Sequence, residues 1–224
     1  MTIPPERRAR FVERRSMVAA GVACAALLLG WRWWRSAGAT AAPARMPIVH
    51  ASTRVALGSF QLDSDRIVAA DPAFAGDERT RLTLTGAARG QWDAWIGKAE
   101  LRDAGTRAVE LGATRHGASG LNWVVLGGLG VGVDSGQAGF YDPKYVGDAS
   151  LLPPVTTWRQ PPIDDSNLWY SFSCDQTEYP NLAGLLPHGV VSSAGLGDGV
   201  YQLLVSRADG VLVGIRMIFV EQGD

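Results

Sequence analysis

The stretch Val200-Tyr-Gln-Leu-Leu-Val-Ser-Arg-Ala-Asp-Gly-Val-Leu-Val-Gly-Ile-Arg-Met-Ile-Phe-Val220 decides the fold class of this chain. Its two halves, Val200–Ser206 and Val211–Val220, are apolar segments of strand length joined by a short polar connection. That connection contains Asp209-Gly210, and an Asp-Gly pair readily takes the positive φ angles that a two-residue type I′ hairpin requires. The stretch therefore predicts two antiparallel strands, the second apolar enough to be buried on both faces in the middle of a sheet.

Further segments of the same kind precede this hairpin and are separated by glycine, proline, aspartate and asparagine. Residues alternate with a period of two in Arg81–Thr85 and in Arg107–Leu111, as a half-buried strand requires. A strand at Gly189–Ser193 would complete a three-stranded meander, and no segment of the domain competes as a helix. The expected earlier strands are Arg54–Leu62, Ile67–Ala70, Arg81–Thr85, Trp92–Leu101, Arg107–Thr114, Leu121–Val133, Ala138–Tyr141 and Leu168–Cys174. We therefore expect an all-β domain, either an antiparallel β-sandwich or a set of strongly twisted sheets, preceded by an N-terminal apolar helix.

Two segments have compositions that need a separate interpretation. Leu151–Leu168 contains two proline pairs, which a central strand does not tolerate, so we expect a surface loop. Leu126–Gly132 is rich in glycine but lacks the Gly-Lys-Ser/Thr of a phosphate-binding loop. We expect a glycine-rich strand or a bulge there.

The N-terminal part of the chain differs sharply in charge from the rest. The 224 residues have a formal net charge of -1, but eight arginines and only two glutamates lie in residues 1–45. Five of these arginines precede the uncharged apolar run Met17–Trp31, which is the layout of an export signal. We therefore divide the chain into residues 1–45, a signal sequence or membrane anchor plus linker, and residues 46–224, the all-β domain.

Two interpretations of residues 1–45 stay open. Small residues at Ala37-Gly-Ala39 suit cleavage by a signal peptidase, whereas Trp31–Arg35 is bulky and basic, as is typical of an uncleaved segment anchored at a membrane interface. Both interpretations place the domain outside the cytoplasm, in the periplasm of a bacterium or held at its membrane through the N-terminal segment. A cytoplasmic protein with a buried apolar helix is the weaker alternative.

Composition excludes several classes of protein. A hydrophobic content of 46% and a charged content of 19% are those of a globular domain, and they exclude a disordered chain. Residues 46–224 contain 13 basic and 20 acidic side chains, dispersed rather than clustered, so this domain repels nucleic acid. Its one cysteine, Cys174, cannot form an internal disulfide and is expected to be a small buried hydrophobe.

The sequence predicts no metal or other cofactor. The three histidines are scattered, which argues against zinc. A calcium site from aspartates of several loops is conceivable, but no Asp-x-Asp-x-Asp spacing supports it. The aspartates considered for it are Asp134, Asp142, Asp175 and Asp198.

Two strand-to-turn segments stand out as candidate binding loops, since glycines and small polar side chains allow a close approach to the backbone. They are Val133–Gln137 and Val191–Tyr201. With Tyr141–Pro143 and Gly214–Phe219, these segments resemble a bacterial family of uncharacterised proteins, the domain of unknown function 4241. The resemblance spans about residues 54 to 220; it implies an all-β fold and no catalytic role.

The sequence favours a noncatalytic envelope protein that binds a protein or small-molecule ligand. The expected binding residues are Asp134, Ser135, Gln137, Ser192, Ser193, Asp198, Tyr201 and, in the proline-rich loop, Trp158. The alternative is a serine-type hydrolase, in which Ser192 or Ser193 is the nucleophile, His188 the base and Asp134 or Asp198 the orienting acid. No Gly-x-Ser-x-Gly element supports that alternative.

Overall fold

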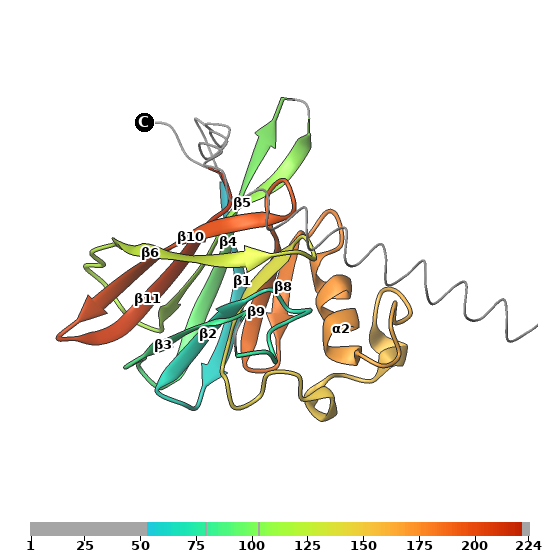
Figure 1. The fold of residues 1–224 in the computed structure, drawn as a ribbon, viewed down its shortest axis with the longest axis horizontal. Helices are drawn as coiled ribbons and strands as arrows, with labels where there is room; N and C mark the ends of the chain where they lie inside the picture. Colours follow the sequence, from blue (N-terminus) through green and yellow to red (C-terminus); the bar gives the residue numbers. More distant parts are fainter. Residues whose placement is uncertain (1–52, 79, 103, 221–224) are drawn as a thin grey trace, which may run out of the picture. The chain divides into compact units, whose positions relative to one another are not determined.

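The computed structural model describes residues 53–78, 80–102 and 104–220 of the chain. Within them it is mostly β, with two antiparallel sheets and one short α-helix (Figure 1). The predictions for the apolar segment and linker in residues 1–45 lie outside the described residues. None of the described helices is long and apolar enough to cross a membrane.

The larger sheet has six strands in the order β1-β4-β5-β11-β10-β6, and the smaller has five in the order β3-β2-β7-β9-β8. The strands of the larger sheet are β1 (Thr53–Leu62), β4 (Gly90–Leu101), β5 (Gly105–Arg115), β6 (Val124–Val133), β10 (Gly199–Ala208) and β11 (Val211–Ile218). Those of the smaller sheet are β2 (Arg66–Ala70), β3 (Leu82–Thr85), β7 (Gln137–Tyr141), β8 (Ala183–Leu186) and β9 (Gly189–Ser193).

The main core lies between the two sheets. Apolar side chains from both sheets form one buried cluster, because alternate residues of each strand point toward the other sheet. Ile96, Leu111 and Ile215 contribute from the larger sheet, and Phe140 and Val190 from the smaller. The prediction of a domain built from antiparallel strands is therefore confirmed: it is mostly β, with two antiparallel sheets of six and five strands.

The final hairpin forms where the sequence predicts it. Ala208 pairs with Val211, which leaves Asp209-Gly210 as a two-residue turn with φ angles of 52° and 81°. Strand β11 lies between β5 and β10, inside the larger sheet. Only one of its faces is fully buried, because the other carries Arg216 on the outer side of the sheet.

The predicted three-stranded meander is wrong. Strand β9 pairs with β7 and β8 in the smaller sheet, so residues 194–198 carry the chain from one sheet to the other. Strand β9 is suited to a central position because Val190 faces the main core while Val191 faces a second apolar cluster. A strand buried on both faces is apolar throughout, so its pattern does not show which sheet it joins.

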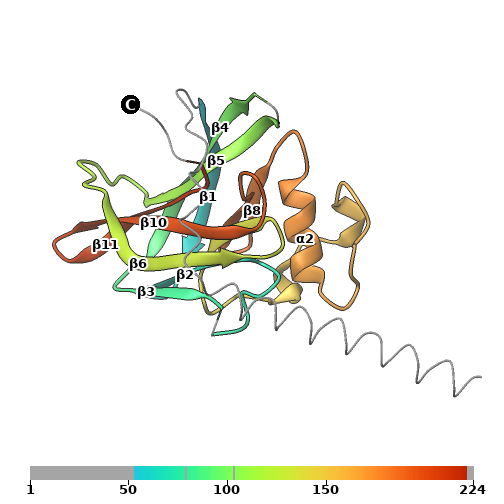
Figure 2. The same ribbon diagram turned by 45° about the horizontal axis from the view of Figure 1, so that its top comes forward.

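The strand predicted at Leu168–Cys174 is also wrong, because this segment forms the helix α2 (Leu168–Thr177). Asn167 caps the helix by accepting a hydrogen bond from the Tyr170 backbone N–H. Trp169 and Phe172, three residues apart, pack on the outer side of the smaller sheet. Figures 1 and 2 show α2 beside β8, with the β10–β11 hairpin extending away from it.

The remaining predictions concern two loops. Strand β6 is the glycine-rich strand expected at Leu126–Gly132, and its pairing with β10 shifts register between Gln202 and Leu204. The proline-rich segment is an exposed loop with two short 3-10 helices, Ala149–Leu151 and Val155–Thr157. Strand β8, which the sequence analysis missed, follows α2.

Candidate functional site

Asp134 and Ser135 form the turn between β6 and β7, where the buried carboxylate of Asp71 holds them. One carboxylate oxygen of Asp71 accepts the backbone N–H groups of both residues at 2.8 Å, and the other accepts the Ser135 hydroxyl at 2.7 Å. The side chain of Asp134 itself is exposed. These contacts give the Asp-Ser-Gly element a structural function, which is to fix the turn.

Gln137 and Ser193 are paired across β7 and β9 on the face that α2 covers. The Gln137 side-chain N–H donates to the Cys174 sulfur at 3.1 Å, so Cys174 is half-buried against a polar group. The Gln137 Oε1 and Ser193 Oγ atoms are buried without a hydrogen-bond partner among the described residues. Gln137 and Ser193 therefore lie on the same face of the smaller sheet, and the expectation that Ser135, Gln137 and Ser193 bind a ligand stays a prediction.

The structure does not bring together the serine and histidine residues that a hydrolase would need. Ser192 is fully buried, and its hydroxyl donates to the Ser193 carbonyl. His188 precedes the other end of β9, four residues or about 13 Å away along an extended strand. There His188 donates from Nδ1 to the Gln61 carbonyl and stacks on Tyr145, with ring centroids 3.8 Å apart.

Tyr201 and Trp158 also make structural contacts. The Tyr201 hydroxyl donates toward the carbonyls of Ala194 and Gly197, and so holds the connection between the sheets, near the exposed Asp198. Burial, followed by the negative charge of Asp198, raises the pKa of Tyr201. Trp158 is half-buried, and its ring lies 5.1 Å from that of Phe172.

Two of the four aspartates considered as calcium ligands accept backbone hydrogen bonds in separate places. Asp142 accepts from the amides of Asp63, Ser64 and Lys144, and Asp175 accepts from those of Arg159 and Gln160. Over the described ranges, no group of three or more histidine, cysteine or acidic side chains is arranged to hold a metal ion.

The most developed cluster of charged and aromatic groups lies elsewhere, on the outer face of the six-stranded sheet. Glu110 on β5 points away from the main core, because the neighbouring Val109 and Leu111 point into it. Its carboxylate is nevertheless fully buried. Arg54 donates to one of its oxygens at 2.6 Å, and Arg216 donates to the other in a short ion pair.

Two tryptophans cover this ionic cluster. The Trp95 indole N–H donates to Glu110 Oε1 at 3.1 Å, and the Trp95 ring lies edge to face against Trp123, with centroids 6.4 Å apart. Arg54 lies over the Trp95 ring at 5.3 Å, and Arg216 lies over the Trp123 ring at 5.2 Å. The two guanidinium groups therefore bind both the carboxylate and the ring faces.

Three glycines on three adjacent strands make room for these side chains. A Cβ atom at Gly97 would lie 2.5 Å from the Glu110 side chain, and one at Gly214 would lie 2.8 Å from the Trp123 ring. A Cβ atom at Gly112 would overlap the Trp95 ring. The outer face is thus shaped to receive large side chains at defined positions.

A cavity of about 460 Å³ opens beside the tryptophans. It is lined by Arg54, Ala56, Asp93, Ala94, Trp95, Thr114, Leu121 and Trp123. Its volume lies within the usual range of small-molecule sites, and the combination of aromatic walls with a few polar groups is typical of them.

The cavity has a second polar group, the carboxylate of Asp93. It accepts the Ser59 hydroxyl at 2.6 Å and contacts His116 Nδ1 at 2.8 Å. The hydrogen bond from Ser59 is the main cause that lowers the pKa of Asp93, and His116 adds to it against the opposing effect of burial. Asp93 is therefore an anionic hydrogen-bond acceptor at neutral pH.

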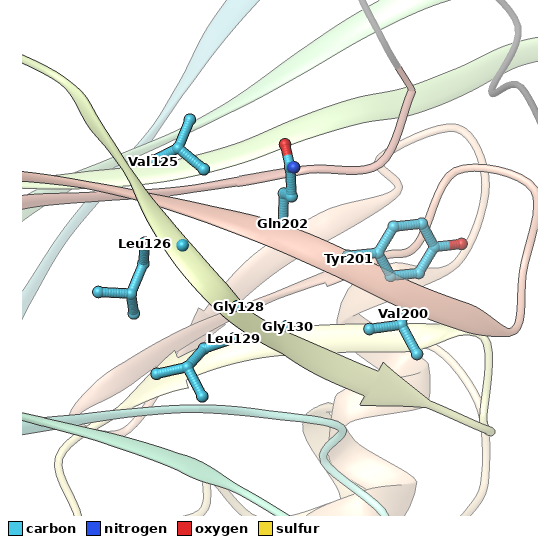
Figure 3. Close-up of a pocket in the computed structure, with 9 residues that line it drawn as sticks. Val125, Leu126, Gly128, Leu129, Gly130, Val200, Tyr201 and Gln202 are labelled. Atoms are coloured by element: carbon cyan, nitrogen blue, oxygen red, sulfur yellow. The ribbon is translucent and has the colours of Figure 1, made fainter. Parts of the chain in front are cut away.

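A smaller cavity of about 280 Å³ lies along β6 and β10. Figure 3 shows Leu126 and Leu129 projecting to the same side of β6, with Val200, Tyr201 and Gln202 on the neighbouring strand β10. The residues that line it include no charged group, and Leu129 and Val200 are exposed. It offers apolar contact and backbone groups, but no side-chain charge with which to orient a ligand.

Sequence reasoning did not find the cluster on the outer face. The alternation of Arg107–Leu111 predicted a half-buried strand, on which a carboxylate is normally exposed to water, whereas Glu110 is buried. The sequence pattern that could have predicted the cluster is a tryptophan two residues from a glycine on the same strand, such as Trp95-x-Gly97 on β4.

Comparisons with known proteins add no assignment. No family model matches the chain, and neither the curated proteins nor the solved structures include a detectable relative. The resemblance to the family of unknown function stays a prediction, and the functional argument depends on the geometry of the domain.

Proposed function

We propose that this domain is a noncatalytic binding protein whose ligand is a small molecule held in the cavity beside Trp95 and Trp123. The observation that supports it is the buried Glu110 carboxylate, which fixes Trp95 by a hydrogen bond and both arginines by ion pairs. A site whose aromatic walls are fixed in advance loses little side-chain entropy on binding. The N-terminal charge pattern supports export or membrane anchoring of the domain, as an expectation from sequence.

Binding is favoured over the hydrolase alternative by the contacts of the candidate residues. A nucleophilic serine needs a base within hydrogen-bond reach, whereas Ser192 donates to a backbone carbonyl and His188 is held at the other end of β9. In the cavity on the outer face, His116 and Asp93 are paired, but the serine beside them donates to Asp93 rather than to the histidine.

Calorimetric screening tests the proposal. The compounds are neutral saccharides, amino acids, short peptides, carboxylic acids and nucleosides, titrated into the full-length protein. We expect at least one class to bind, with binding weakened at least tenfold by Trp123→Ala and retained in Trp158→Ala. Trp158→Ala is the matched control because it removes a half-buried indole far from the cavity lining. Equal weakening in both variants, or no binding by any class, would contradict the proposal.

A further inference from the structure

The chemistry of the cavity beside Trp95 and Trp123 restricts the class of ligand, and the inference below rests on the proposed function. The first constraint is charge. Arg54 and Asp93, the two charged residues that line the cavity, have opposite charges, and the buried Glu110 carboxylate is paired with Arg54 and Arg216. A ligand with a net charge would find no unpaired opposite charge there. No new ion pair would then offset the free-energy cost of removing the charged ligand from water.

The second constraint is the placement of donors and acceptors. Arg54 uses Nε for Glu110, and its side chain is 56% exposed, so its terminal N–H groups are available as donors. Asp93 is 44% exposed and retains acceptor capacity beyond its bonds to Ser59 and His116. The cavity therefore presents a donor group and an acceptor group on the same wall.

The spacing of these groups follows from strand register. Arg54 pairs with Gly97, and Asp93 lies four residues earlier on β4, about 13 Å away at the backbone. Trp95 lies midway between them, with Trp123 as a second aromatic wall. A ligand that reaches both polar groups must place a partly apolar surface against the exposed part of the Trp95 side chain, beside the Arg54 guanidinium that lies over the ring.

We propose that the ligand is a neutral saccharide of one to three sugar rings. A pyranose ring has an apolar face of C–H groups that packs on an indole, and its hydroxyls donate to Asp93 and accept from Arg54 at the ring edge. A hydroxyl group is uncharged and can both donate and accept a hydrogen bond. It therefore suits a cavity that offers one donor, Arg54, and one acceptor, Asp93. The cavity volume of about 460 Å³ suits a ligand of this size.

The test is an NMR titration of the ¹⁵N-labelled full-length protein, observed at the indole N–H signals of Trp95 and Trp123. Neutral di- and trisaccharides are compared with uronic-acid oligosaccharides and zwitterionic tripeptides of similar length. We expect neutral saccharides to shift both indole signals, with an affinity that changes less than twofold between 50 and 500 mM NaCl, because no ion pair forms. Asp93→Asn should weaken binding about fivefold to tenfold, while Asp165→Asn in the exposed loop should not change it.

Two outcomes overturn the inference and separate it from the proposed function. If only charged or zwitterionic compounds shift the Trp95 and Trp123 signals, the ligand class is wrong and the binding site stands. If no compound of any class shifts them, both the inference and the proposed function fail. Unchanged affinity in Asp93→Asn would also contradict the proposed contact.

Discussion

Glu110 on β5 and Arg216 on β11 form an ion pair on the outer face of the six-stranded sheet, although Glu110 has no exposed surface. Arg54 binds the second carboxylate oxygen, and Trp95 donates to the same oxygen as Arg54. A buried carboxylate with these partners fixes Arg54 and Trp95, which line the cavity, and Arg216, which lies over the ring of Trp123. The contacts of Glu110 that stabilise this cluster therefore also position side chains of the cavity.

Replacement of Glu110 tests this link through stability. Glu110→Gln leaves two guanidinium groups without their counter-charge, and we expect the free energy of unfolding to fall by about 2–4 kcal/mol, near the usual range for a broken buried pair. Urea denaturation measures the change. Glu100→Gln is the matched control, since Glu100 is exposed and, among the described residues, accepts a side-chain hydrogen bond from Thr106 alone; it should cost less than about 0.5 kcal/mol.

The effect of Glu110→Gln on the free energy of unfolding should also depend on pH. Burial alone would raise the pKa of Glu110, but the hydrogen bonds and charges of Arg216 and Arg54 lower it below its ordinary value. A lowered pKa in the folded state contributes stability above the unfolded pKa, about 4.3, and this contribution is lost as pH falls through the folded pKa. The difference in unfolding free energy between wild type and Glu110→Gln should therefore shrink as pH falls from 6 to 3. A constant difference would show that the carboxylate is not stabilised by the arginines.

Gly112→Ala tests whether the Trp95 ring is held over the sheet. The added methyl group overlaps the ring, so we expect a loss of about 1–3 kcal/mol in stability and a large change in the Trp95 indole N–H signal. Gly132→Ala on β6 is the control, because its methyl group would meet open space. Equal, small effects in both variants would mean that Trp95 does not occupy this position.

Asp71→Asn tests the anchor of the β6–β7 turn. Asp71 accepts four hydrogen bonds, including two from the amides of Asp134 and Ser135, and an amide group cannot accept them all. We expect a loss of about 2–4 kcal/mol in urea denaturation. Asp134→Asn, at the exposed side chain of the same turn, should stay within about 0.5 kcal/mol of wild type. A reversed order of the two effects would assign the anchoring function to Asp134.

Reaction with a fluorophosphonate tests the hydrolase alternative. Ser192 is buried and Ser193 has no histidine within its contacts, so we expect no stoichiometric labelling of the folded domain. Mass spectrometry after incubation measures the modified fraction. Stoichiometric labelling that disappears in Ser192→Ala or Ser193→Ala would favour catalysis over simple binding.

The turn residues and the pattern of apolar residues in the sequence were sufficient to predict the hairpin at Asp209-Gly210 and most strand positions. It failed at Leu168–Thr177, since serines and aromatics suit a strand, while the Asn167 cap and burial of Trp169 and Phe172 favour a helix. Sheet membership of β9 was not predictable, because both of its faces are buried. The cavity depends on cross-strand neighbours such as Trp95 and Gly112, which are distant in sequence and meet only through register.

The central claim, that the ligand binds between Trp95 and Trp123, is tested most directly by intermolecular nuclear Overhauser effects in a complex with the tightest-binding compound. The account predicts contacts from ligand protons to the ring protons of both tryptophans. Contacts confined to Trp158, or to Leu129 on β6, would contradict it.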